Sequence, residues 1–145
     1  ENARYEDPYA GGIGNSVRFM AIAPRDDTLK VNGVPNLFCA GEKAGLFVGH
    51  TEAIATGALA GYNAVRYSLG KDLLTLPRST AVGEYIAYGR ERMETEEGLS
   101  DKFTFSGSVY FNRMNELGTY TTDVAEIQRR VEQAGVANVF MEPVV

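Results

Sequence analysis

The sequence predicts an α/β fold that becomes α+β toward its C-terminus, and two patterns carry this prediction. Residues 37–40 form a short apolar run without polar alternation that stops at Gly41, as expected for a strand buried on both faces of a sheet. Over residues 51–69, apolar side chains recur at helical spacing, and Gly70 follows as a terminator. A buried strand followed by a turn and a long helix is typical of an α/β unit.

A β-hairpin is predicted just before that unit. Residues 28–31 and 34–40 flank Asn32 and Gly33, a strong signal for a two-residue type I′ turn. Pro35 places the beginning of the second arm at an edge or entry position of the sheet. Upstream, we expect a loop over residues 1–16 and a strand over residues 17–23.

The second half of the sequence predicts helices separated by less regular segments. Residues 71–78 form a hydrophobic linker, and Ser79 or Thr80 is placed to cap a second helix that ends by Gly98. The aromatic and small residues of 103–111 suggest one or two strands broken at Gly107.

A third helix is expected near the C-terminus. Asp123, followed three residues later by Glu126, resembles a capping arrangement, and Gly135 stops the helix. Residues 136–145 form a further strand or a tail. We therefore divide the chain into a portion of one domain over residues 1–76 and a small helical or mixed region over residues 77–145.

Composition limits the possible functions. The 145 residues are 44% hydrophobic and carry a net charge of -5, so no broad basic surface is available for nucleic acid. One histidine and one cysteine cannot supply the usual ligands of a metal site. The lone Cys39 fits a reducing compartment, and no membrane span or signal peptide is evident, so a cytoplasmic location is expected.

The turn between strand and helix is the candidate binding site. Gly41, Gly45 and Gly49 let the backbone approach a ligand closely, and Glu42 stands where the strand ends. A helix that begins near His50 and Thr51 directs unpaired N–H groups at the same place, which suits an anion or an electron-rich ring.

One stripe of the long helix has almost no side chains. Ala53, Gly57 and Gly61 are spaced four residues apart and share a face. Glycine in a helix costs up to about 1 kcal/mol relative to alanine, so this stripe predicts close packing.

The same stretch resembles a known family. The pattern AGE, followed after a few residues by GHTEAIATGALAGYNAVR, is similar to the last cofactor-contacting motif of FAD-dependent oxidoreductases of the two-dinucleotide-domain type, and is closest to the GidA-like branch. That branch includes flavoproteins that modify tRNA uridines. The preceding VPNLFCAG matches the strand that enters the motif. The resemblance implies the C-terminal part of a Rossmann-like FAD-binding domain, with a small helical or mixed extension.

The resemblance also implies which residues contact FAD. Glu42 would accept a hydrogen bond from a ribityl hydroxyl, and the backbone at the helix start would face the pyrimidine edge of the flavin and tune its reduction. No catalytic residue is assigned: a lone His50 at a helix start is more often a hydrogen-bonding group than an acid or base, and Cys39 is more often core. The implied cofactor-binding set is Gly41, Glu42, Gly49, His50, Thr51, Glu52 and Ala53.

Three interpretations of function follow. The first is the C-terminal piece of an FAD-dependent oxidoreductase. Its expected partners are FAD, a nicotinamide donor and the upstream part of its own chain. As an isolated fragment, this piece is expected to be inactive and without FAD. The second is a non-catalytic scaffold, a docking module or a homo-oligomer built on the C-terminal helix. The third is a part of a tRNA-uridine-modifying enzyme; tRNA-modifying members usually carry Gln in place of Glu42 and an aromatic residue in place of His50, which favours the broader flavoprotein interpretation.

Overall fold

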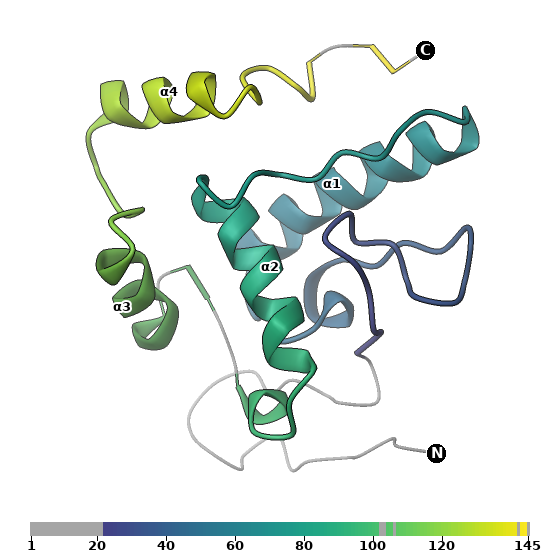
Figure 1. Cartoon of the computed structure of the whole chain (residues 1–145), viewed down its shortest axis with the longest axis horizontal. Coiled ribbons are helices and arrows are strands. Elements are labelled where there is room, and N and C mark those ends of the chain that lie inside the picture. Colours follow the sequence, from purple (N-terminus) through teal and green to yellow (C-terminus); the bar gives the residue numbers. More distant parts are fainter. Residues whose placement is uncertain (1–21, 102–103, 106, 142, 145) are drawn as a thin grey trace.

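The computed structural model describes residues 22–101, 104–105, 107–141 and 143–144, and this part of the chain is helical. The predicted loop over residues 1–16 and most of the predicted strand over 17–23 lie outside the described residues. Figure 1 shows the arrangement of the elements, which in chain order are η2 (Gly41–Ala44), α1 (His50–Ser68), α2 (Ala81–Met93), η3 (Gly98–Ser100), α3 (Ser108–Glu116) and α4 (Val124–Gln133).

The predicted fold class is wrong. The described residues form four α-helices and no β-strand, so neither the α/β sheet of a Rossmann-like domain nor the β-hairpin is present among them. Where the hairpin was expected, two isolated antiparallel bridges join Arg25 to Val31 and Lys30 to Phe38.

The reason lies in the backbone of the two expected arms. Cys39 donates its N–H to the carbonyl of Leu29, and Val31 donates to the carbonyl of Leu37, so the arms do meet. However, Leu29 has a positive φ of 66°, which interrupts the extended conformation that a strand requires. The apolar run therefore forms a paired loop instead of an interior strand.

The helices agree better with the sequence. The predicted helix over residues 51–69 corresponds to α1. The predicted caps of two further helices are also confirmed. The Thr80 hydroxyl accepts from the N–H of Gly83 at 3.1 Å, and the Asp123 carboxylate accepts from the N–H of Ala125 at 2.9 Å. The strand expected after Gly107 is wrong, because α3 begins at Ser108, while residues 103 and 106 of the strand expected before it lie outside the described residues. Tyr110 and Met114, four residues apart, are both buried, which is the helical period.

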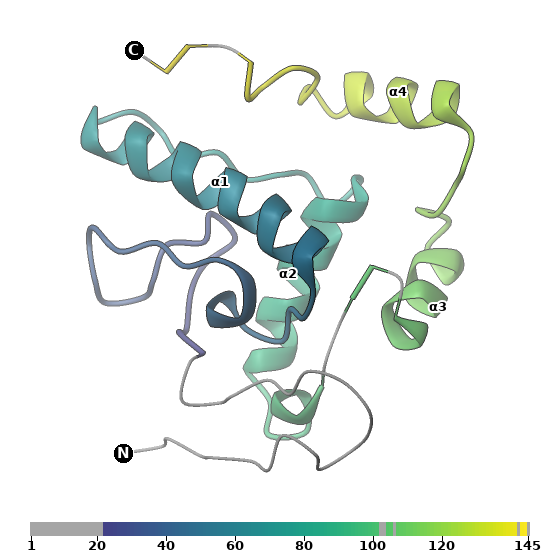
Figure 2. The same ribbon diagram turned by 180° about the vertical axis from the view of Figure 1, so that it is seen from behind.

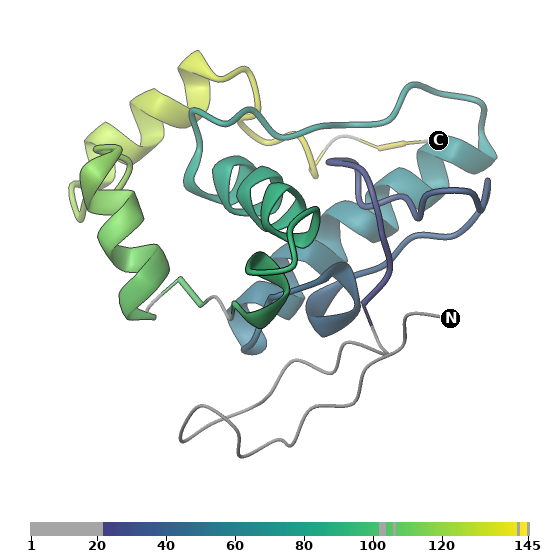
Figure 3. The ribbon, with the colours of Figure 1, turned by 60° about the horizontal axis from the view of Figure 1, so that its bottom comes forward.

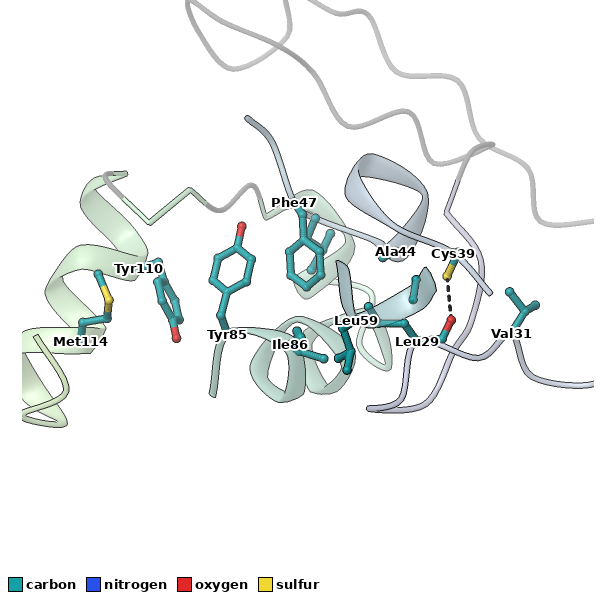
Figure 4. Close-up of a cluster of buried hydrophobic side chains, with 12 residues drawn as sticks. Leu29, Val31, Cys39, Ala44, Phe47, Leu59, Tyr85, Ile86, Tyr110 and Met114 are labelled. Atoms are coloured by element: carbon teal, nitrogen blue, oxygen red, sulfur yellow. Dashed lines mark hydrogen bonds between the residues drawn. The ribbon is translucent and has the colours of Figure 1, made fainter. Parts of the chain in front are cut away.

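The buried core joins residues from before and after α1. Figure 4 shows Tyr85 of α2 between Phe47 and Tyr110, with Leu59 of α1 beside Ile86. The rings of Phe47 and Tyr85 are stacked with centroids 4.4 Å apart, and Tyr110 meets Tyr85 edge-on at 4.7 Å. Aromatic pairs at these distances stabilise a core beyond the effect of area alone. The loop that follows η2 is thus packed on α2, and Tyr85 of α2 joins it to Tyr110 of α3.

Arg25 connects the loop before η2 to this core. The residue is only 1% exposed, and its guanidinium donates to the carbonyls of Ala44 at 3.0 Å and Ile86 at 2.9 Å. It also lies over the ring of Phe47, 5.3 Å from the centroid. Burial lowers the pKa of Arg25 to about 10, which leaves the group charged near neutral pH.

The periphery consists of α3, α4 and the segment that follows them. Figure 3 shows α4 at the edge of the molecule, and none of its residues is buried. Val124 and Ile127 on α4 are exposed, as is Phe140, whose ring meets Tyr62 of α1 edge-on at 5.3 Å. In the part of the chain that the structure describes, no helix has both the length and the apolar character needed to cross a bilayer.

Candidate functional site

The candidate site is the junction between η2 and the first two turns of α1, which lie side by side in Figure 2. Gly41 has a φ of 59°, and its N–H donates to the hydroxyl of Thr56 at 2.8 Å. That hydroxyl in turn donates to the carbonyl of Glu52 at 2.7 Å. A Cβ at Gly41 would lie 3.5 Å from the Cβ of Ala53. The structure therefore brings Gly41, Glu52 and Ala53 of the predicted set together through Thr56.

The first turn of α1 offers backbone donors at the surface. Gly49 occupies the N-cap position with a φ of 127°, and no described side chain caps the helix there. Gly49, His50 and Thr51 are all exposed. The first N–H groups of a helix have no partner within the helix, and they carry the positive end of its dipole. This turn can therefore bind a ligand edge rich in hydrogen-bond acceptors.

Glu52 differs from the other predicted residues because it is buried. Its side chain is 3% exposed, and its carboxylate accepts a hydrogen bond from the backbone N–H of Phe105 at 2.6 Å. A Cβ added to Gly49 would lie 2.3 Å from Oε2 of Glu52, so this carboxylate covers the N-cap residue. The side chain of Glu52 supports the turn from inside.

Glu42 is exposed on η2, and its proposed contact with a ligand hydroxyl stays a prediction. Its backbone carbonyl accepts from the N–H of Gly45 and closes the turn of η2. The surface hollow formed by Asp26 and residues 30–35 includes none of the predicted site residues. Of the predicted set, Glu42, residues 49–51 and Ala53 are exposed, whereas Gly41 and Glu52 are buried.

The small-residue stripe of α1 is open over most of its length. A Cβ at Gly57 or Gly61 would meet no described atom within 4 Å. Ile54 on the same side of the helix is 73% exposed. The close packing predicted for this stripe is therefore found only where Ala53 meets Gly41 among the described residues.

Two buried side chains near the site are poorly suited to proton transfer. Burial raises the pKa of the Tyr85 hydroxyl well above its ordinary value, and the nearby carboxylate of Glu52 raises it further. Burial likewise raises the pKa of the Cys39 thiol, although Arg25 opposes this in part. Cys39 donates to the carbonyl of Leu29 at 3.7 Å and belongs to the core. No group of metal-ligating side chains occurs among the described residues.

Sequence reasoning missed two residues that build the site. Thr56 is four residues after Glu52, so a helix over these residues places the Thr56 hydroxyl near the carbonyl of Glu52. This spacing could have been recognised from the sequence. Phe105 is 53 residues from Glu52 and was assigned to a strand. No local pattern relates these two residues, because their contact depends on how α2 and α3 pack.

The chain matches the family described as glucose inhibited division protein A, GidA, over residues 1–72. This segment includes η2, α1 and every residue of the predicted set. The helices α2, α3 and α4 lie beyond it.

Several curated relatives match part of the chain, and all of them are named methylenetetrahydrofolate–tRNA-(uracil-5-)-methyltransferase TrmFO. The protein of Caldicellulosiruptor bescii is 44% identical over 54 residues, which are 37% of this chain and 12% of the relative. That of Moorella thermoacetica is 43% identical over 61 residues, 42% of this chain and 14% of the relative. That of Streptococcus sanguinis is 38% identical over 63 residues, 43% of this chain and 14% of the relative.

The match therefore spans about one eighth of the length of these relatives. No solved structure matches the chain. The family match and the relatives agree with the resemblance read from the residues of η2 and α1. Through residues 1–72, this chain is a member of the GidA-like group.

Proposed function

We propose that this chain supplies part of the FAD site of a flavoprotein, with the first turn of α1 and Glu42 as the groups that contact the cofactor. The observation that carries the proposal is the exposed, uncapped helix start at Gly49, His50 and Thr51 inside the segment that matches the GidA family. Bound FAD would supply the electron transfer, and the residues of this chain would bind and orient it.

The residues present fit such a cofactor in two respects. The free N–H groups of the first turn suit the carbonyl and nitrogen acceptors at the pyrimidine edge of a flavin. Glycine at position 49 adds no side chain of its own beside these donors, and the exposed Glu42 can accept from a hydroxyl group.

Binding can be tested in the full-length protein by its absorbance and by titration with FAD. We expect a yellow protein, and we expect Glu42→Ala to weaken FAD binding by roughly 10- to 150-fold, since a hydrogen bond to a charged acceptor contributes roughly 1.5–3 kcal/mol. Glu97→Ala is the matched control, because the side chain of Glu97 is 88% exposed and lies outside the site. A full-length protein that neither contains FAD nor takes it up would refute the proposal.

We also propose that the helix start makes the flavin easier to reduce. Negative charge that develops on the pyrimidine edge would be stabilised by the N–H groups and the dipole of α1. His50 occupies the first helical position, where proline is tolerated and removes one N–H. His50→Pro should therefore lower the flavin reduction potential, whereas His50→Ala, which keeps the N–H, should leave it near the wild-type value. Equal potentials in the two variants would contradict this role.

A second candidate function is modification of tRNA uridines. It is favoured by the relatives that are named tRNA-(uracil-5-)-methyltransferases. The chain itself carries a net charge of -5, which does not favour binding of tRNA, so RNA contacts would belong to other parts of the full-length protein. Deletion of the gene should then remove a modified uridine from cellular tRNA. Persistence of every modified uridine would rule this function out.

Three further expectations remain predictions for the full-length protein. These are reduction by a nicotinamide donor, a cytoplasmic location, and a homo-oligomer formed through the C-terminal helix. A non-catalytic scaffold would share the last property but not the flavin, so the absorbance measurement separates it from the leading proposal.

A further inference from the structure

We propose that Glu52 is a positioning residue that couples the segment at Phe105 to the proposed cofactor-contacting turn. The proposal rests on the proposed function, since it concerns the same turn at Gly49 and His50. It goes further because Phe105 lies outside the family-matched residues, so it assigns a part of the downstream region to the support of the cofactor site.

The two oxygens of the Glu52 carboxylate lie against two backbone positions, Phe105 and Gly49. One oxygen, Oε1, accepts from the N–H of Phe105 at 2.6 Å, while the other, Oε2, lies 2.3 Å from the place where a Cβ on Gly49 would stand. The residue is 3% exposed, and none of the ion pairs found among the described residues includes Glu52. The carboxylate is therefore stabilised by the backbone N–H of Phe105 and by the positive end of α1.

The segment at Phe105 is itself held by aromatic packing. The ring of Phe105 lies 4.4 Å from that of Tyr85, centroid to centroid, and 6.1 Å from that of Tyr110. Tyr85 stacks on Phe47, and the Tyr110 hydroxyl donates to the carbonyl of Ala81 at 3.0 Å. These contacts place the Phe105 N–H, and through Glu52 they place the N-cap residue of α1.

The length of the Glu52 side chain is the testable feature. Aspartate keeps the charge but is one methylene shorter, so it cannot reach the Phe105 N–H from the same backbone position. Glutamine keeps the length and one carbonyl acceptor but removes the charge. If Glu52 positions the turn by reaching Phe105, glutamine rescues the function and aspartate does not.

The experiment uses the full-length protein with FAD as the probe. FAD affinity is measured by titration, and hydrogen exchange is measured on the peptide that contains Phe105, with and without FAD. In wild type, we expect FAD to slow exchange at this peptide. Glu52→Asp should weaken FAD binding by roughly tenfold and remove that protection, whereas Glu52→Gln should stay within about threefold of wild type and keep it. Glu97→Asp is the matched control and should change neither quantity.

The outcomes separate this inference from the function on which it rests. If wild type binds FAD and Glu52→Asp binds it equally well, with unchanged protection at Phe105, the positioning role is refuted and the FAD site stands. If aspartate is tolerated and glutamine is not, the charge matters and the reach to Phe105 does not, which also overturns the inference. A wild-type protein without FAD binding overturns both proposals. Circular dichroism of each variant checks that the helices are retained.

Discussion

Asn63 of α1 forms two hydrogen bonds with the backbone of Leu74, donating to its carbonyl at 2.8 Å and accepting from its N–H at 2.7 Å. The same side chain donates to the carbonyl of Thr28 at 2.9 Å. One fully buried amide thus holds the loop before η2 and the segment after α1 on the same helix. Figure 1 shows that segment, residues 71–77, running back alongside α1 toward α2.

Replacing Asn63 by alanine should destabilise this chain by about 2–4 kcal/mol, because three backbone groups would lose their partner in a buried position. Urea unfolding followed by circular dichroism measures the change. Asn115→Ala is the control, since Asn115 is exposed and bonds only within α3, and it should stay within about 0.5 kcal/mol of wild type. Equal stabilities for the two variants would contradict the role of Asn63.

Arg25→Lys tests whether the planar guanidinium is required. A single ammonium cannot replace donors that reach the carbonyls of Ala44 and Ile86 in different directions. We expect a loss of about 2–4 kcal/mol in the free energy of unfolding. Arg129→Lys on the exposed face of α4 is the comparison and should have almost no effect. A tolerated lysine at position 25 would show that charge alone suffices there.

Two glycine substitutions should act in opposite directions. Gly89→Ala places a Cβ 2.6 Å from a ring carbon of Phe47, so α2 must shift, and we expect a destabilisation of about 1–3 kcal/mol. Gly61→Ala in α1 meets no described atom and should stabilise the helix by roughly 0.5–1 kcal/mol. Thermal unfolding compares both with wild type. A destabilising Gly61→Ala would mean that the open stripe of α1 is covered in the protein.

The buried carboxylate of Glu84 predicts a pH dependence. Burial raises the pKa of Glu84, but hydrogen bonds from Arg78 and Arg113 outweigh it and bring the pKa below its ordinary value of 4.5. A carboxyl whose folded-state pKa is lowered stabilises the fold above the unfolded-state pKa, and this contribution is lost as the pH falls through the folded-state pKa. The free energy of unfolding should therefore decrease as the pH is lowered from about 5.

Glu84→Gln should remove this part of the pH dependence and should reduce stability near pH 7. Urea unfolding at a series of pH values measures both effects. Glu97→Gln, at an exposed position, serves as the control and should follow the wild-type curve. A wild-type curve that is unchanged by Glu84→Gln would show that other groups cause the acid sensitivity.

The sequence by itself determined the features that depend on near neighbours in the chain. The extent of α1, the caps at Thr80 and Asp123, and the membership in the GidA-like group could all be read from it. Helical spacing and caps act over three or four residues, so their signal is local. The residues grouped at the turn before α1 were also identified in this way, and their contact with FAD stays a prediction.

Only the tertiary structure decided the features that depend on distant residues. Whether residues 28–40 form strands depends on partners for their backbone groups, and the left-handed Leu29 together with the paired loop shows that they do not. The burial of Glu52 likewise depends on Phe105, which follows it by 53 residues. The physical reason is that a buried polar group needs a partner wherever the packing provides one, and no local pattern shows where that partner lies in the chain.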